Sequence, residues 1–203
     1  RERRSHPILR TRFRRGPQGL SEEQPPLPIV SNTSPLIWLS KVGRITLLKK
    51  LFGEIIIPEE VYKEAVERGL QEGFSDALAI KECVDQGWIK ISKLNEREIK
   101  LCQKMMEHAF EIHPGEAQAI ILARGLGVLL LMDESSGRAF AETLGLRVRG
   151  TLYVVMKALR EKLLDRVEAK EIVLALVSKG FRIEPKLLAR ILREIETSIP
   201  RRK

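Results

Sequence analysis

The chain of 203 residues is long enough for one domain with appended segments, and its hydrophobic content of 43% suits a globular protein with a core. No apolar run approaches the ~20 residues of a membrane-spanning helix, and the polar, basic N-terminus is not expected to be a secretory signal peptide. The formal net charge of +9 lies mainly at the ends, because residues 1–28 carry seven Arg against three Glu and Arg201, Arg202 and Lys203 close the chain. Such basic ends either contact nucleic acid or are simply solvated.

The first predicted element is a short buried strand that stops at Asn32, Thr33 and Ser34. We expect the preceding residues, 1–28, to form a poorly ordered, proline-rich basic arm. Ser34 is a suitable N-cap for the helix that follows, with Pro35 as its first residue. Ligands of parallel α/β sheets bind at the carboxyl ends of strands, so this point is a candidate site.

Strands and helices then alternate along residues 29–164. We predict strands over residues 54–58, 88–94, 128–132 and 146–148, and helices over residues 35–42, 45–52, 59–68, 76–86, 96–111, 114–124, 135–144 and 151–164. The strand at 88–94 alternates apolar and polar residues, which predicts that one of its faces is exposed. This alternation of elements predicts a three-layer α/β/α sandwich with a mainly parallel central sheet.

The pattern changes after residue 164. Residues 167–179 and 184–195 are predicted to form two amphipathic helices joined by Gly180-Phe181-Arg182-Ile183. We expect residues 165–203 to form a C-terminal helical appendage with a basic tail. Its apolar side chains need cover, which favours packing on the domain rather than on a partner.

Four polar residues are predicted to converge at the carboxyl edge of the sheet. Asn32 and Asp133 each end a buried strand, Glu116 lies in the first turn of the helix before the strand of Asp133, and Glu64 lies on the inner side of its helix. Carboxylates held close together repel one another, and a divalent cation relieves that repulsion. Oxygen ligands without His or Cys favour Mg²⁺ or Mn²⁺, so we expect Glu64, Glu116 and Asp133 to bind such an ion and to support phosphodiester hydrolysis.

Each of these residues also has an ordinary structural explanation when it is taken alone. Asp133 could cap its helix, and Glu116 could serve only the helix dipole. Glu64 could be solvated, and Asn32 could make a local turn. The predicted metal site therefore depends on their joint placement.

The order of these motifs resembles the PIN-domain nucleases, and within them a prokaryotic VapC-like branch. The resemblance rests on Asn32-Thr33-Ser34-Pro35-Leu36, Pro58-Glu59-Glu60-Val61-Tyr62-Lys63-Glu64, His113-Pro114-Gly115-Glu116-Ala117, Leu131-Met132-Asp133 and Gly150-Thr151-Leu152. It covers residues 29–164, extends through the C-terminal helical pair and does not reach residues 1–28.

The resemblance implies a metal-dependent ribonuclease that hydrolyses RNA with Mg²⁺ or Mn²⁺ and an activated water. In such an enzyme Thr33 and Ser34 would assist at the metal-bound water, and Glu134 would add a carboxylate. Many relatives are toxins neutralised by a small antitoxin, and many dimerise. The resemblance thus implies RNA, an antitoxin protein and a second copy of the chain as partners.

One residue departs from the family pattern, because Asn32 stands where the family usually has Asp. An amide oxygen can still ligate a metal, but it adds no charge and cannot act as a base. Two hypotheses follow: an active ribonuclease, or a weakened or inactive PIN-like module that binds RNA or protein. A nucleotide cofactor is not expected, because the chain has neither a P-loop nor a glycine-rich turn after the first strand.

The remaining composition bears on location and source. Cys83 and Cys102 have no metal-site spacing and make no disulfide framework, so we expect a reducing, cytoplasmic environment. A charged fraction of 31%, with asparagine only at positions 32 and 95, favours a thermophilic source.

Overall fold

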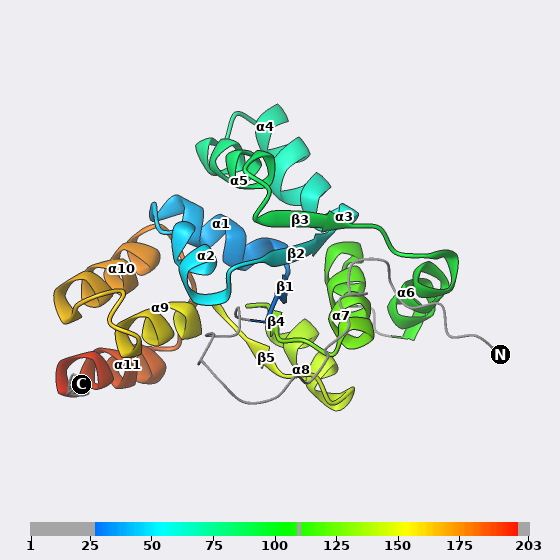
Figure 1. Ribbon diagram of the computed structural model, residues 1–203. Coiled ribbons are helices and arrows are strands. Elements are labelled where there is room, and N and C mark those ends of the chain that lie inside the picture. Colours follow the sequence, from blue (N-terminus) through cyan, green and yellow to red (C-terminus); the bar gives the residue numbers. More distant parts are fainter. Residues whose placement is uncertain (1–26, 109–110, 199–203) are drawn as a thin grey trace, which may run out of the picture.

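The computed structural model describes residues 27–108 and 111–198, and its strands in this part form one parallel sheet (Figure 1). The strands are β1 (Ile29–Ser31), β2 (Ile55–Pro58), β3 (Ile89–Ser92), β4 (Leu130–Leu131) and β5 (Val148–Arg149), in the order β3-β2-β1-β4-β5. The predicted α/β/α architecture with a mainly parallel sheet is confirmed. The predicted basic arm and tail lie outside the described residues.

Helices cover both faces of this sheet. One face packs against α1 (Thr33–Lys41), α2 (Thr46–Phe52), α5 (Ser75–Asp85) and α9 (Thr151–Arg160), with α10 (Arg166–Ser178) on α9 and α11 (Pro185–Thr197) on α10. The other face packs against α7 (Pro114–Leu126) and α8 (Ser135–Thr143), with α6 (Glu96–His108) on α7. A further helical stretch after β2 comprises α3 (Glu59–Tyr62), the π-helical segment η2 (Lys63–Arg68) and α4 (Gly69–Gln71).

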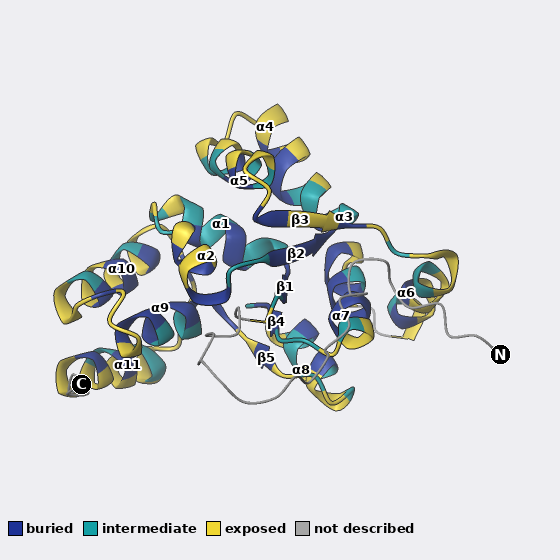
Figure 2. Cartoon of the chain, viewed as in Figure 1, coloured by how far each residue is buried: buried dark blue, intermediate teal, exposed yellow. Residues whose placement is uncertain are grey.

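The two faces arise from the alternation of side chains along each strand. Val30 pairs with Ile56 and Leu130 in register, and all three pack in the core under α6, α7 and α8. Their neighbours Ile29 and Leu131 belong to the opposite core. The central strands are buried on both faces (Figure 2), as expected of a parallel sheet that is covered by helices on both sides.

The C-terminal helical pair packs against the rest of the chain. Ile172 and Leu176 of α10 and Ile191 of α11 are buried in the same core as the sheet residue Leu131. The ring of Phe181, between the two helices, meets the ring of Trp38 edge to face at a centroid distance of 5.3 Å. The boundary at residues 164–165 stays a prediction.

Three local predictions were wrong. Helix α1 begins at Thr33, directly after Asn32 in extended conformation, so Ser34 lies within the first turn instead of capping it. The helical stretch after β2 continues to Gln71, although a break was expected from residue 69. One face of β3 was expected to be exposed and the other covered, but the successive residues Lys90 and Ile91, which point to opposite faces, are both exposed. β3 is the edge strand of the sheet, where the helices cover both faces less completely.

None of the helices in residues 27–108 and 111–198 is long and apolar enough to cross a membrane.

Candidate functional site

The carboxyl ends of three adjacent strands bring distant residues together. β1 lies beside β4, and β4 lies beside β5, so Asn32, Asp133 and Thr151 follow neighbouring strand ends. The backbone N–H of Asn32 donates a hydrogen bond of 2.8 Å to the carbonyl of Leu131 at the end of β4. The segment η2 and helix α7 approach the same edge and carry Glu64 and Glu116.

A cavity of about 320 Å³ opens at this edge. It is lined by most of the polar residues predicted for the site and by one aromatic wall: Asn32, Thr33, Ser34, Ile37, Trp38, Glu64, His113, Glu116 and Glu134. The structure thus brings together Asn32, Glu64, Glu116 and Glu134 from segments spread over a hundred residues. We call this space the carboxylate cavity.

The two hydroxyls after β1 contact the carboxylates directly. Thr33 Oγ1 donates a hydrogen bond of 2.6 Å to Oε2 of Glu64. Ser34 Oγ lies 3.1 Å from Oε2 of Glu134 and 3.3 Å from Oδ2 of Asp133. Both hydroxyls therefore orient acidic side chains.

Asn32 contacts one carboxylate through its amide nitrogen. Its Nδ2 donates a hydrogen bond of 3.2 Å to Oε2 of Glu134. Its Oδ1 is buried and has no hydrogen-bond partner within the described ranges. A buried acceptor without a partner is costly, and a donor or a cation bound in the cavity would satisfy it.

Asp133 lies behind this cavity rather than in its lining. Its Oδ1 accepts a hydrogen bond of 2.7 Å from the backbone N–H of Thr151, and its Oδ2 accepts one of 2.6 Å from Thr151 Oγ1. It lines a second cleft, to which Ser34 does not contribute. Ser34 Oγ therefore links Asp133 to Glu134 and to the carboxylate cavity.

Three glycines make room for three of the carboxylates. A Cβ at Gly115 would lie 2.6 Å from Oε2 of Glu64, and a Cβ at Gly150 would lie 2.6 Å from Oδ1 of Asp133. At Gly137, a Cβ would lie 2.6 Å from Sδ of Met132 and 3.3 Å from Oε1 of Glu116. Side chains larger than hydrogen at these positions would displace the acidic groups.

Burial makes two of the carboxylates hard to ionise. It raises the pKa of Glu116, which the nearby Glu134 and Glu64 raise further and the hydrogen bond from the His113 backbone opposes. Burial also raises the pKa of Asp133, against the two hydrogen bonds from Thr151. Both groups would gain from a positive partner.

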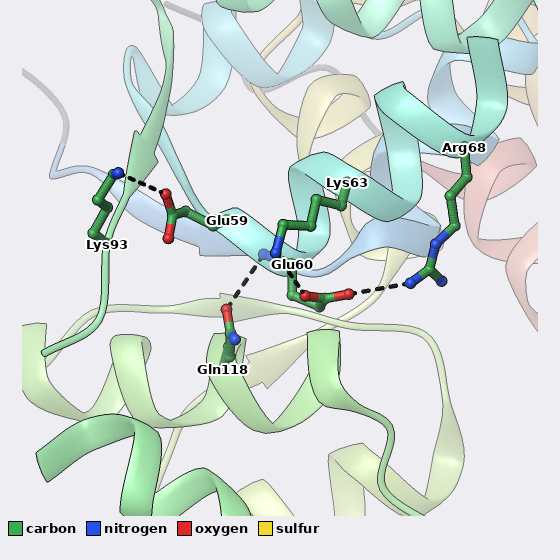
Figure 3. Close-up of polar contacts among 6 residues, drawn as sticks. All are labelled: Glu59, Glu60, Lys63, Arg68, Lys93 and Gln118. Atoms are coloured by element: carbon green, nitrogen blue, oxygen red, sulfur yellow. Dashed lines mark hydrogen bonds and ion pairs between the residues drawn. The ribbon is translucent and has the colours of Figure 1, made fainter. Parts of the chain in front are cut away.

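The start of the helical stretch that carries Glu64 contacts two other segments: Glu59 pairs with Lys93 after β3, and Glu60 meets Gln118 on α7 (Figure 3). The backbone N–H of Glu60 donates a hydrogen bond of 3.3 Å to Oε1 of Gln118 on α7, and the Glu60 carboxylate pairs with Lys63 at 3.3 Å and Arg68 at 3.2 Å. Glu64 itself lies in the π-helical segment η2, whose wider turn re-aims side chains relative to an α-helix.

The donors in this region suit a hard divalent cation. Carboxylate, amide and hydroxyl oxygens predominate, and the unpartnered Oδ1 of Asn32 and the glycine-made space fit such an ion. In the part of the chain that the structure describes, no three His, Cys, Asp or Glu side chains are placed to hold one ion together. Binding would therefore require the acidic side chains to draw closer.

The sequence alone did not assign a role in the site to Thr151 or to Gly115, Gly137 and Gly150. Gly150 and Thr151 do fall in one of the motifs that carry the family resemblance. The position of Thr151 as the first residue of the helix after β5 is the signal that could have identified it.

Comparison with known families gives one match. A family model described as a PIN domain matches residues 28–197. No curated protein matches the chain.

Proposed function

The chain belongs to the PIN-domain family, whose fold is of nuclease type, and from this membership we propose that it is a metal-dependent ribonuclease. The single observation that carries the proposal is the convergence of Glu64, Glu116 and Glu134 on one cavity, with Asp133 joined to it through Ser34. Of these side chains Glu116 is buried and the other three are partly buried, and gathered carboxylates are costly unless a cation or a proton neutralises them.

In this proposal Glu64, Glu116 and Asp133 hold Mg²⁺ or Mn²⁺, and Glu134 supplies a further oxygen. When bound, the ion polarises a phosphoryl oxygen and lowers the pKa of a water molecule. Thr33 keeps the Glu64 carboxylate turned toward the cavity by its hydrogen bond of 2.6 Å. Burial raises the pKa of Glu116, so this carboxyl keeps its proton to a higher pH than a solvated glutamate does.

Asn32 would contribute to the site differently from an aspartate, because its side chain is neutral. Its amide nitrogen orients Glu134, and its free Oδ1 is a neutral donor for the cation. It cannot accept a proton, so proton transfer falls to the remaining carboxylates.

The test is cleavage of a labelled single-stranded RNA by the full chain with Mg²⁺, with Mn²⁺ or with EDTA. We expect cleavage only with a divalent ion, and a loss of more than about 100-fold in Asp133→Asn and Glu116→Gln. Glu142→Gln is the matched control, because Glu142 is exposed on α8 and does not line the cavity. Cleavage that persists in EDTA or in both site variants would reject the proposal.

The second candidate is a non-catalytic PIN-like module that binds RNA or protein, and the neutral Asn32 favours it. If this is correct, the native chain binds RNA without cleaving it under any divalent ion. In that case Asn32→Asp should raise the affinity for Mn²⁺ and could restore cleavage, because it adds the missing charge.

We further propose that the ribonuclease is a cytoplasmic toxin that forms a homodimer and is neutralised by a small antitoxin. The support is the resemblance of its motifs to the VapC-like branch. Induced expression should arrest growth of a bacterial host, and Asp133→Asn should relieve the arrest. Light scattering of the purified chain tests the dimer.

A further inference from the structure

A second cleft lies beside the carboxylate cavity and reaches Asp133 from the other side. Its volume is about 400 Å³, and four arginines line it: Arg138, Arg149, Arg182 and Arg190. We propose that this arginine cleft binds the sugar–phosphate backbone of the RNA strand next to the cleavage site. The proposal rests on the proposed ribonuclease function and adds to it the path of the substrate.

The charge of the cleft is strongly one-sided. Its lining contains four arginines against two acids, Asp133 and Glu184. Arg149, Arg182 and Arg190 are exposed, and Arg138 is partly buried. Among residues 27–108 and 111–198, none of the four guanidinium groups forms an ion pair with a carboxylate. Their charges are therefore available to a ligand.

The four arginines come from different elements that meet only in the folded chain. Arg138 lies on α8, Arg149 at the end of β5, Arg182 in the α10–α11 connection and Arg190 on α11. The docking of the C-terminal helical pair thus completes the cleft. Guanidinium groups bind phosphate through paired N–H donors, and several of them along a groove match the spaced charges of a nucleic-acid strand.

The ring of Tyr153 contacts one arginine of the cleft, Arg149, and a second arginine outside it, Arg160. The guanidinium carbons of Arg149 and Arg160 lie 5.5 Å and 5.9 Å from the centroid of its ring. Such contacts restrict two long side chains without neutralising their charge. Tyr153 and Arg149 line the cleft and Arg160 does not, so the ring positions one of the cleft arginines.

The cleft and the carboxylate cavity are adjacent, and one side-chain contact joins their walls. Asp133 lines the cleft, and Ser34, which lines the cavity, lies 3.3 Å from Oδ2 of Asp133. At Gly150, a Cβ would lie 2.6 Å from Oδ1 of Asp133 and 3.0 Å from Nη1 of Arg138, so this glycine admits both groups. A strand held by the arginines would thus pass Asp133, next to the wall of the carboxylate cavity.

The test measures RNA binding in EDTA, where the proposed cleavage cannot occur. Fluorescence anisotropy would follow a labelled single-stranded RNA with the full chain, with Arg182→Gln/Arg190→Gln, and with Lys186→Gln/Arg193→Gln as the control. Both doubles remove two exposed positive charges at or near α11, but Lys186 and Arg193 do not line the cleft. An acidic peptide, polyglutamate, serves as a second probe.

We expect the double variant Arg182→Gln/Arg190→Gln to bind RNA about 10-fold more weakly or worse. The slope of the logarithm of the binding constant against the logarithm of the salt concentration should become about 1.4 less steep, because two phosphate contacts are lost. The control double should change the affinity by less than about 2-fold. Equal losses in both doubles, or no loss in either, would overturn the proposal. Binding of polyglutamate without binding of RNA would also overturn it and would assign the cleft to an acidic protein segment.

Failure of this inference is distinguishable from failure of the proposed function. A chain that binds RNA through the cleft but never cleaves it would keep the inference and lose the ribonuclease. If the chain cleaves RNA and the variant Arg182→Gln/Arg190→Gln has an unchanged KM, the ribonuclease stands and the RNA-binding role of the cleft is wrong.

Discussion

Thr151 holds both carboxylate oxygens of Asp133, through its backbone N–H at 2.7 Å and its hydroxyl at 2.6 Å. Both bonds favour the charged form of Asp133, against the burial that raises its pKa. The bonds come from the first residue of α9, so the start of that helix determines where the carboxylate lies.

We predict that Thr151→Val lowers the free energy of unfolding by about 1–3 kcal/mol, because it removes the 2.6 Å hydrogen bond to Oδ2 of Asp133 and leaves that oxygen only the longer contact with Ser34. Thr151→Ser keeps the hydroxyl and should lose much less. Urea denaturation of both variants in EDTA measures the difference. Equal losses in the two variants would show that packing of the methyl group, and not the hydrogen bond, is responsible.

Glu116 predicts a pH-dependent stability in the metal-free chain. Burial raises its pKa above the ordinary 4.5, so the folded chain binds this proton more tightly than the unfolded chain does. The resulting stabilisation is full below pH 4.5 and is lost as the pH rises through the raised pKa. Glu116→Gln has no such loss, and its amide oxygen can still accept from the His113 backbone.

The unfolding free energy of Glu116→Gln should therefore rise relative to that of the native chain as the pH increases through this window. Denaturation curves in EDTA at a series of pH values provide the measurement. Parallel pH profiles would contradict the raised pKa. Added Mn²⁺ should stabilise the native chain more than the variant.

Gly115→Ala should disturb the site more than the fold. The new Cβ would lie 2.6 Å from Oε2 of Glu64, so that carboxylate must move. Misplacement of a reacting group by about 1 Å costs on the order of 100-fold in rate, and we expect a loss of that size in RNA cleavage. The stabilisation by Mn²⁺ should fall as well.

The control for this prediction lies on the same helix. A Cβ at Gly125 would lie 3.7 Å from Oε1 of Glu98, which is an ordinary contact. Gly125→Ala should leave cleavage unchanged and add up to about 1 kcal/mol of stability, since alanine favours the helix. If Gly115→Ala behaves in the same way, the position of Glu64 is not important for activity.

Leu176 tests whether the C-terminal pair is part of the main core. It is fully buried, whereas Leu174 on the same helix is 46% exposed. Leu176→Ala should cost about 2–5 kcal/mol, and Leu174→Ala less than about 0.5 kcal/mol. Thermal unfolding of both variants should show one cooperative transition. A second transition in Leu176→Ala alone would mean that the pair unfolds separately.

The sheet could be predicted because its signals are local. The run Ile55-Ile56-Ile57 and the apolar residues before Asp133 can only be buried strands, and alternation with helices makes them parallel. The placement of Asn32 and Asp133 at one edge of the sheet follows from that topology alone.

The directions of the side chains could not be predicted in the same way. Asp133 and Glu134 are adjacent, yet Asp133 lines the arginine cleft while Glu134 lines the carboxylate cavity. The spacing of residues does not reveal how the chain turns where a strand ends. Two of the four cleft arginines lie on or beside α11, whose docking depends on packing between distant segments.

The π-helical turn at Lys63–Arg68 holds one residue more than an ordinary helical turn would. Deleting one residue there would convert the turn to regular α geometry, so the side chains within the turn, Glu64 among them, would point in new directions. Glu64 would no longer meet Gly115. The number of residues between β2 and α4 is therefore as strict a requirement as their identity, and deletion scanning should find this turn intolerant.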